Sequence, residues 1–131
     1  MSSAPGQLPP EVIERLAPYV DRDALTAFRA RTVMPWTWLP RALRVGAVTL
    51  GANVSFRTGR YDPTTPRGLA LIAHECVHVR QYRELGTFRF LLSYARHALA
   101  VRGDHDSHPM EVEAEALQAR LRSELAEPPA G

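Results

Sequence analysis

Five residues in the middle of the chain, His74-Glu75-Cys76-Val77-His78, decide how the rest of the sequence is interpreted. On a helix, residues four positions apart lie on the same face, one turn above the other. His74 and His78 could therefore hold one metal ion between their imidazole rings. Glu75 is rotated by about 100° from His74, so its carboxylate reaches the edge of the same face, close to a water molecule beside the metal.

The flanking sequence predicts that this stretch lies on a helix. Thr65 followed by Pro66 is a typical cap and first position, and Gly86 is a typical C-terminal stop. An apolar stripe at helical spacing lies roughly opposite the two histidines, which we therefore expect to lie off the core face. The stripe consists of Leu69, Ile72, Ala73, Cys76 and Val77. Cys76 is expected to be a small buried hydrophobe, neither a ligand nor a nucleophile.

The sequence before this helix predicts a short helix, weak strands and a loop. Residues 10–16 read as a helix that begins at a proline, and the span from Val45 to Arg57 reads as two strands around a turn or as one bent strand. The segment from Met34 to Pro40 is expected to be a loop or an edge, because proline cannot donate to a ladder. Its two tryptophans, Trp36 and Trp38, are expected to pack over the core.

Two more helices are predicted after Gly86. The first, residues 87–101, is apolar over more than half its circumference, so we expect it to be the most buried helix. The second begins at Pro109 and extends to about Ala126, with an apolar stripe for the core. Residues 1–10 are expected to be a flexible leader, residues 11–126 a single domain, and residues 127–131 a tail.

Composition and charge exclude several classes of protein. The chain has 131 residues, of which 45% are apolar and 23% charged, with a net charge of +2, as in a single globular domain. No dense basic block indicates nucleic-acid binding, and no apolar run is long enough to span a membrane. One cysteine permits no internal disulfide. Without a recognisable signal peptide the expected location is the cytoplasm, although a dedicated export route would leave no such mark.

Two histidines do not complete a catalytic zinc site, which normally has three protein ligands and one water. No third histidine follows His78 at the spacing of the extended three-histidine motif. A glutamate from a later helix is the other solution. Glu111 and Glu115 are four residues apart on one face of the predicted last helix, whereas Glu113 should face solvent. The alternative is a solvated helix face that carries ion pairs at this spacing.

Two segments together resemble a known group of enzymes. Leu71–Gln81, with its H-E-x-x-H-x-x-Q pattern, and Pro109–Glu115 resemble the gluzincin clan of zinc peptidases. In particular, they are similar to small single-domain mini-gluzincins and to the metallopeptidase-like core domain of extracellular contractile injection systems. This resemblance implies that Glu111 is the third ligand and that Glu115 orients His74.

The resemblance also implies a fold. It is the zincin-like α+β class, with a small mixed β-sheet or β-ribbon packed on the active-site helix, followed by two C-terminal helices. The strand region Val48–Phe56 would form the rim along which an extended peptide lies.

Two functions follow as hypotheses. The first is a zinc-dependent endopeptidase, in which Zn²⁺ is held by His74, His78 and Glu111 and Glu75 is the general base; its partners are peptide or protein substrates. The second is a zinc-binding or degenerate domain that docks in a secretion or toxin-associated assembly without proteolysis. The group that stabilises the oxyanion is not identified by any motif. The candidates are His105, His108, Tyr82 and Tyr61.

Overall fold

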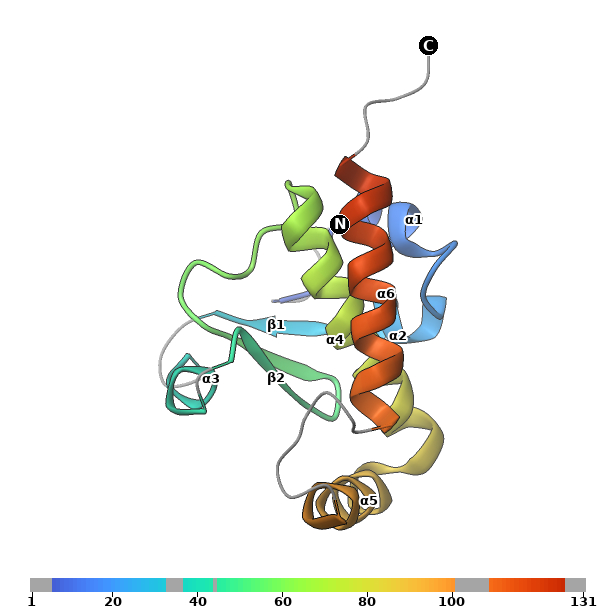
Figure 1. Ribbon diagram of the computed structural model, residues 1–131. Helices are drawn as coiled ribbons and strands as arrows, with labels where there is room; N and C mark the ends of the chain where they lie inside the picture. The colour runs from blue at the N-terminus through green and yellow to red at the C-terminus, as the bar shows by residue number, and fades with distance from the viewer. Residues whose placement is uncertain (1–5, 33–36, 44, 101–108, 127–131) are drawn as a thin grey trace.

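The computed structural model describes residues 6–32, 37–43, 45–100 and 109–126, and within them it has the predicted α+β class (Figure 1). The helices are α1 (Pro10–Leu16), α2 (Arg22–Ala27), α3 (Trp38–Ala42), α4 (Pro66–Leu85), α5 (Thr87–Ala100) and α6 (Pro109–Ala126). The strands are β1 (Arg29–Arg31), β2 (Ala47–Leu50) and β3 (Asn53–Phe56). None of the helices so described is long and apolar enough to cross a membrane.

The small sheet is mixed, with the strand order β1-β3-β2. Strands β2 and β3 form an antiparallel hairpin, so the two-strand alternative for this region is confirmed. Gly51 makes the turn possible because its positive φ of 67° is readily adopted only by glycine. Strand β1 pairs in parallel with β3, where Ala30 lies opposite Val54. Strand β2 is therefore an edge of the sheet in the described part of the chain.

Helix α4 lies at the centre of the molecule and begins and ends where the sequence predicts. The Thr65 side chain accepts a hydrogen bond from the Gly68 amide at 3.1 Å, and Gly86 ends the helix with a φ of 82°. Cys76 is fully buried in the apolar stripe, as expected. The opposite face is buried too, contrary to expectation, because β2, α5 and α6 cover it. His74 and His78 thus lie in the interior, on a second covered face.

Helix α6 runs along α4 in the opposite direction (Figure 1). Ala114 and Leu121 are fully buried and attach α6 to the core, as the predicted apolar stripe requires. This contact is the most extensive between any two described elements, and it brings the first turn of α6 beside the middle of α4. The two histidines and Glu111 are thereby brought together.

Over the side chains that the structure describes, helix α5 is not the most buried helix; α4 is. Phe90 is buried against α4, but Phe88 is 79% exposed, and Leu91 and Leu92 are also exposed. A high apolar content shows only how many apolar side chains a helix carries. It does not show how many other elements pack against that helix. Helix α5 packs against α4 on one side, which leaves Phe88, Leu91 and Leu92 exposed.

Two expectations about the first half of the chain are also corrected. Helix α3 begins inside the predicted loop, and its Trp38 is 61% exposed, so this side chain does not pack over the core; Trp36 lies outside the described residues. Residues 6–10 are not a flexible leader: the Gly6 carbonyl accepts a hydrogen bond from the Ala30 amide, and Leu8 is buried. Residues 1–5 and the predicted tail, residues 127–131, lie outside the described ranges.

Candidate metal centre

Three of the predicted ligands converge between α4 and α6. The Nε2 atom of His78 lies 2.7 Å from Oε1 of Glu111, and Nε2 of His74 lies 3.6 Å from Oε2 of the same carboxylate. The donor atoms of all three residues are within 4.8 Å of one another. All three side chains are largely removed from solvent.

The charges of this cluster are strongly coupled. Burial alone lowers the pKa of His78, but its hydrogen bond to Glu111 and the charges of Glu75 and Glu111 outweigh burial and raise the pKa to about 9. The pKa of His74 is raised for the same reasons against the same opposing burial. Burial raises the pKa of Glu111, yet the two histidines hold it well below its usual range. Without a metal ion, the site therefore favours protonated imidazoles around an ionised carboxylate.

The donor set fits a divalent metal ion. Catalytic zinc sites use three protein ligands of this kind and keep one position open. With zinc–ligand bonds near 2.0–2.2 Å, two tetrahedral ligand atoms lie about 3.3–3.6 Å apart. The spacing of 3.6 Å between His74 and Glu111 is within this range. The 2.7 Å contact between His78 and Glu111 would open by roughly 0.6–0.9 Å. Imidazole and carboxylate also suit other first-row ions, so the donor set is compatible with several divalent metals.

Gln81 holds the second histidine in position. Its Oε1 lies 2.9 Å from Nδ1 of His78, and its Nε2 donates to the Met110 carbonyl at 3.2 Å and to Glu113 at 3.3 Å. Because the amide oxygen can only accept, Nδ1 of His78 carries the hydrogen, and Nε2 is left for the metal. The role of Gln81 was missed in the sequence, where its signal is a polar residue one turn after His78.

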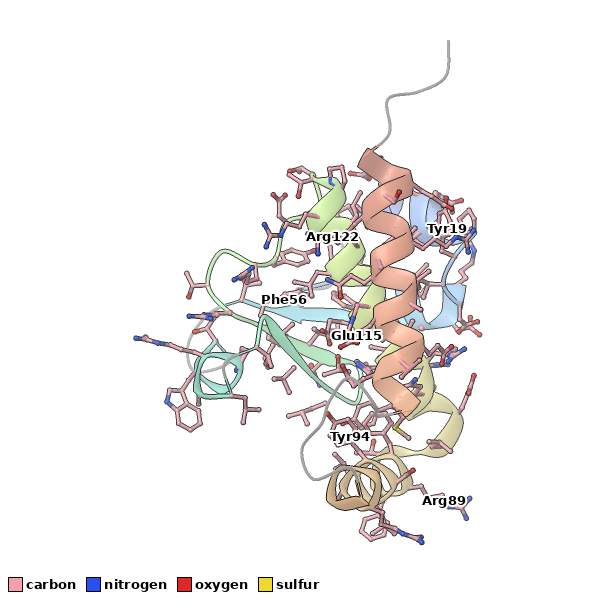
Figure 2. All side chains as sticks on the ribbon, in the orientation of Figure 1. Tyr19, Phe56, Arg89, Tyr94, Glu115 and Arg122 are labelled. Atoms are coloured by element: carbon pink, nitrogen blue, oxygen red, sulfur yellow. The ribbon has the colours of Figure 1, made fainter. Side chains whose placement is uncertain are left out.

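The predicted contact between Glu115 and His74 is not formed. Nδ1 of His74 is buried and has no hydrogen-bond partner among the described residues. Glu115 lies one turn further along α6 and lines the adjacent cavity (Figure 2). Glu113 is exposed, as predicted, but it is paired with Arg80 and Gln81.

Glu75 is buried next to the ligands and is fixed by the edge strand. Thr49 of β2 donates from its hydroxyl to Oε2 of Glu75 at 2.7 Å. The other oxygen, Oε1, lies 4.0 Å from Nε2 of His74. Thr49 was not singled out in the sequence. Its only signal is a hydroxyl within an otherwise apolar strand, which does not reveal a partner 26 residues away.

Tyr82 is engaged with the sheet. Its hydroxyl donates to the Thr49 carbonyl at 3.1 Å, and its ring stacks on Phe90 with centroids 3.8 Å apart. Burial raises the pKa of Tyr82 to about 12, with a further contribution from Tyr94, so the hydroxyl stays protonated at neutral pH. His105 and His108 lie outside the described residues. Tyr94, which the sequence presented only as part of an apolar helix, also lines the cavity.

A cavity of about 970 Å³ contains these groups. Its walls are β2, the loop before α4, the polar face of α4, and parts of α5 and α6. Figure 2 shows Arg122 and Glu115 along α6 and Tyr94 below them on α5. Among the lining residues are Val48, Thr49, Leu50, His74, Glu75, His78, Tyr82, Tyr94, Glu111 and Glu115.

The fold and the site together define a small α+β domain with a candidate metal centre on its central helix. The family model of the eCIS core domain, named for extracellular contractile injection systems, matches residues 7–86, and the chain belongs to this family. No match was found among curated proteins or among solved structures. The matched region contains His74, Glu75 and His78. The third donor, Glu111, comes from α6, which lies beyond it.

Proposed function

We propose that the protein is a zinc-dependent endopeptidase of the gluzincin type. The observation that carries this proposal is the convergence of His74, His78 and Glu111 beside a buried carboxylate, Glu75, in a cavity large enough to hold part of a peptide. A structural metal site needs no such neighbouring acid and normally has four protein ligands.

Each residue of the site has a defined task in this reaction. A bound zinc ion would supply Lewis acidity and lower the pKa of a water molecule to about 7. Glu75 accepts the proton of the attacking water and delivers it to the leaving amine. The Thr49 hydroxyl holds that carboxylate at a fixed place, and Gln81 holds His78 with Nε2 toward Glu111.

The edge strand offers a binding site for the peptide backbone. Strand β2 pairs with β3 on one side, and its residues Ala47–Leu50 all line the cavity. An extended peptide could add to this edge through main-chain hydrogen bonds, which accept many sequences. The side chain of Thr49 connects this edge with Glu75, so a peptide at the edge would pass beside the general base.

The test compares the wild-type protein with Glu75→Gln on a mixed peptide pool, after both have been loaded with zinc. The wild type should cleave peptides, and the variant should lose at least a hundredfold in rate because a general base is removed. Metal content measured on the same samples should be about one zinc per chain in both. If neither of the two zinc-loaded proteins cleaves any peptide, the proposal is wrong.

A docking role is the second candidate, and one observation favours it. The family is associated with contractile injection systems, and α5 exposes Phe88, Leu91 and Leu92, an apolar surface suited to a protein partner. In this case Glu75→Gln would leave function in the assembly unchanged. Replacing Phe88 and Leu92 by serine would weaken association with the assembly. Co-purification of both variants with the assembly separates the two functions.

A further inference from the structure

The arginines that line the cavity lie away from the metal centre. Around the metal centre lie the carboxylates of Glu75 and Glu111, whereas the far end is lined by three arginines. Arg60 belongs to the loop before α4, Arg67 to the first turn of α4, and Arg122 to α6. Three separate segments thus each contribute an arginine to the lining of the same cavity.

These arginines have no acidic partner among the described residues. Other arginines nearby do: Arg80 pairs with Glu113, and Arg120, two residues before Arg122, pairs with Glu124. Asp62 also lines this end, but its carboxylate accepts hydrogen bonds from the amide and hydroxyl of Thr64, which lower its pKa. With three arginines against the single carboxylate of Asp62, this end of the cavity keeps a net positive charge.

Helical spacing gives the distance from this end to the metal centre. Arg67 and His74 are seven residues apart on one face of α4, or roughly 10 Å along the axis. Glu111 and Arg122 are eleven residues apart on α6, or roughly 16 Å. An extended peptide advances about 3.3 Å per residue. A group held by the arginines would thus be about three to five residues from a bond held at Glu75.

We propose that Arg60, Arg67 and Arg122 bind a carboxylate of the substrate, three to five residues from the bond to be cleaved. Guanidinium groups recognise carboxylates through paired, charge-assisted hydrogen bonds. The carboxylate can come from an acidic side chain or from the C-terminus of a peptide. The inference rests on the proposed peptidase function, since it assigns the specificity of that site.

Two peptide series test the proposal. One moves a single Glu through the five positions on each side of the central bond, with Gln in matched controls. The other compares free and amidated C-termini. Affinity for zinc-loaded Glu75→Gln protein is measured by fluorescence anisotropy, and kcat/KM by cleavage with the wild type. The binding arm does not require turnover, so it gives an answer even if the protein is not a peptidase.

We expect tighter binding, by about fivefold per engaged arginine, at one or two positions of the acidic series or with the free C-terminus. The triple change Arg60→Gln, Arg67→Gln and Arg122→Gln should abolish this preference and leave neutral peptides unaffected. Arg83 is an exposed arginine of α4 outside the cavity, so Arg83→Gln is the matched control and should keep the preference for a carboxylate. High salt should reduce the preference.

Equal affinity for Glu and Gln peptides at every position would overturn the inference, as would a preference that survives the triple change. Failure of the peptidase proposal looks different. In that case acidic peptides are bound selectively but are never cleaved, and Glu75→Gln and wild type behave alike. The two failures are thus distinguishable in one set of measurements.

Discussion

At the scale of single residues, Gln81 connects the metal centre to the rest of the fold. One end of its amide fixes His78, and the other end donates to the Met110 carbonyl and to Glu113 at the start of α6. The same side chain therefore sets the orientation of one ligand and the position of the turn that carries another, Glu111. Among the described residues His74 has no such support at Nδ1, so within them the two histidines are held unequally.

This inequality leads to a prediction for Gln81→Ala. Loss of the partner of His78 should weaken zinc binding by about ten- to a hundredfold, because the imidazole is no longer held with Nε2 toward Glu111. Competition with a chromophoric chelator measures the affinity. Gln118→Ala, which removes an amide lining the cavity further along α6, is the control and should leave the affinity unchanged. An unchanged affinity in Gln81→Ala would show that α4 alone orients His78.

The ligands were predictable from sequence, whereas their supporting partners were not. His74 and His78 are paired by helical spacing alone, and Glu111 was reached through family resemblance. Thr49 and Gln81 act through partners that lie 26 and 29 residues away in the sequence, and only the packing of β2 and α6 on α4 supplies them. The expected contact between Glu115 and His74 does not form for the same reason, since the distance between these two side chains depends on how α6 packs on α4.

At the scale of the elements, the start of α4 depends on close packing against the preceding loop. A Cβ atom on Gly68 would lie 1.8 Å from the Asp62 carbonyl oxygen, which is a backbone atom and cannot move aside alone. Thr65 caps the helix through the amide of this same glycine. The loop that carries Arg60 and Tyr61 is thus held against the first turn of the helix that carries the histidines.

Gly68→Ala should therefore destabilise the protein, although alanine is the better helix former. The clash should cost about 2–3 kcal/mol of unfolding free energy, more than the gain of about 1 kcal/mol from helix propensity. Gly46→Ala is the matched control, because its added Cβ would meet atoms no closer than 3.8 Å and should change stability little. Chemical denaturation measures both. Equal stability of the two variants would mean that the loop before α4 moves to accommodate the added Cβ at no cost in stability.

Element boundaries were also more predictable than element burial. Thr65, Pro66 and Gly86 act on neighbouring backbone groups, so the ends of α4 could be read locally. The burial of α5 and the exposure of Trp38 depend on which other elements cover them, and this information is spread over the whole chain. For the region of the hairpin, the sequence left two alternatives, two strands or one bent strand, since a glycine permits a turn without requiring one.

At the scale of the whole molecule, the candidate metal centre lies between the two helices with the most extensive contact. Two ligands come from α4 and one from α6, so a bound ion would join the family-matched region to the helix beyond it. Without the ion, Glu111 joins them through its contacts with the two imidazoles. The state of protonation of His78 therefore bears on the stability of the whole fold.

The raised pKa of His78 determines how the stability of the metal-free protein changes with pH. Its folded pKa is about 9, above the usual value of 6.5, so the protonated pair stabilises the metal-free protein fully below about pH 6.5 and ceases to do so as the pH rises through about 9. Zinc has the opposite dependence, because it must displace this proton and so binds more tightly as the pH rises. Zinc should therefore stabilise the protein most at high pH, where the metal-free protein is least stable.

We therefore predict that the increase in Tm caused by zinc grows between about pH 6.5 and pH 8.5. At a free zinc concentration of a hundred times Kd, the stabilisation should be about 2.7 kcal/mol, and it should shrink at the lower pH as protons compete. Thermal unfolding with zinc and with a chelator, at matched ionic strength, measures the difference. Glu111→Ala lacks the ligand from α6 and should show a small increase in Tm at every pH. An increase in the wild type that is constant with pH, or one that Glu111→Ala retains in full, would mean that the ion binds elsewhere and does not join α4 to α6.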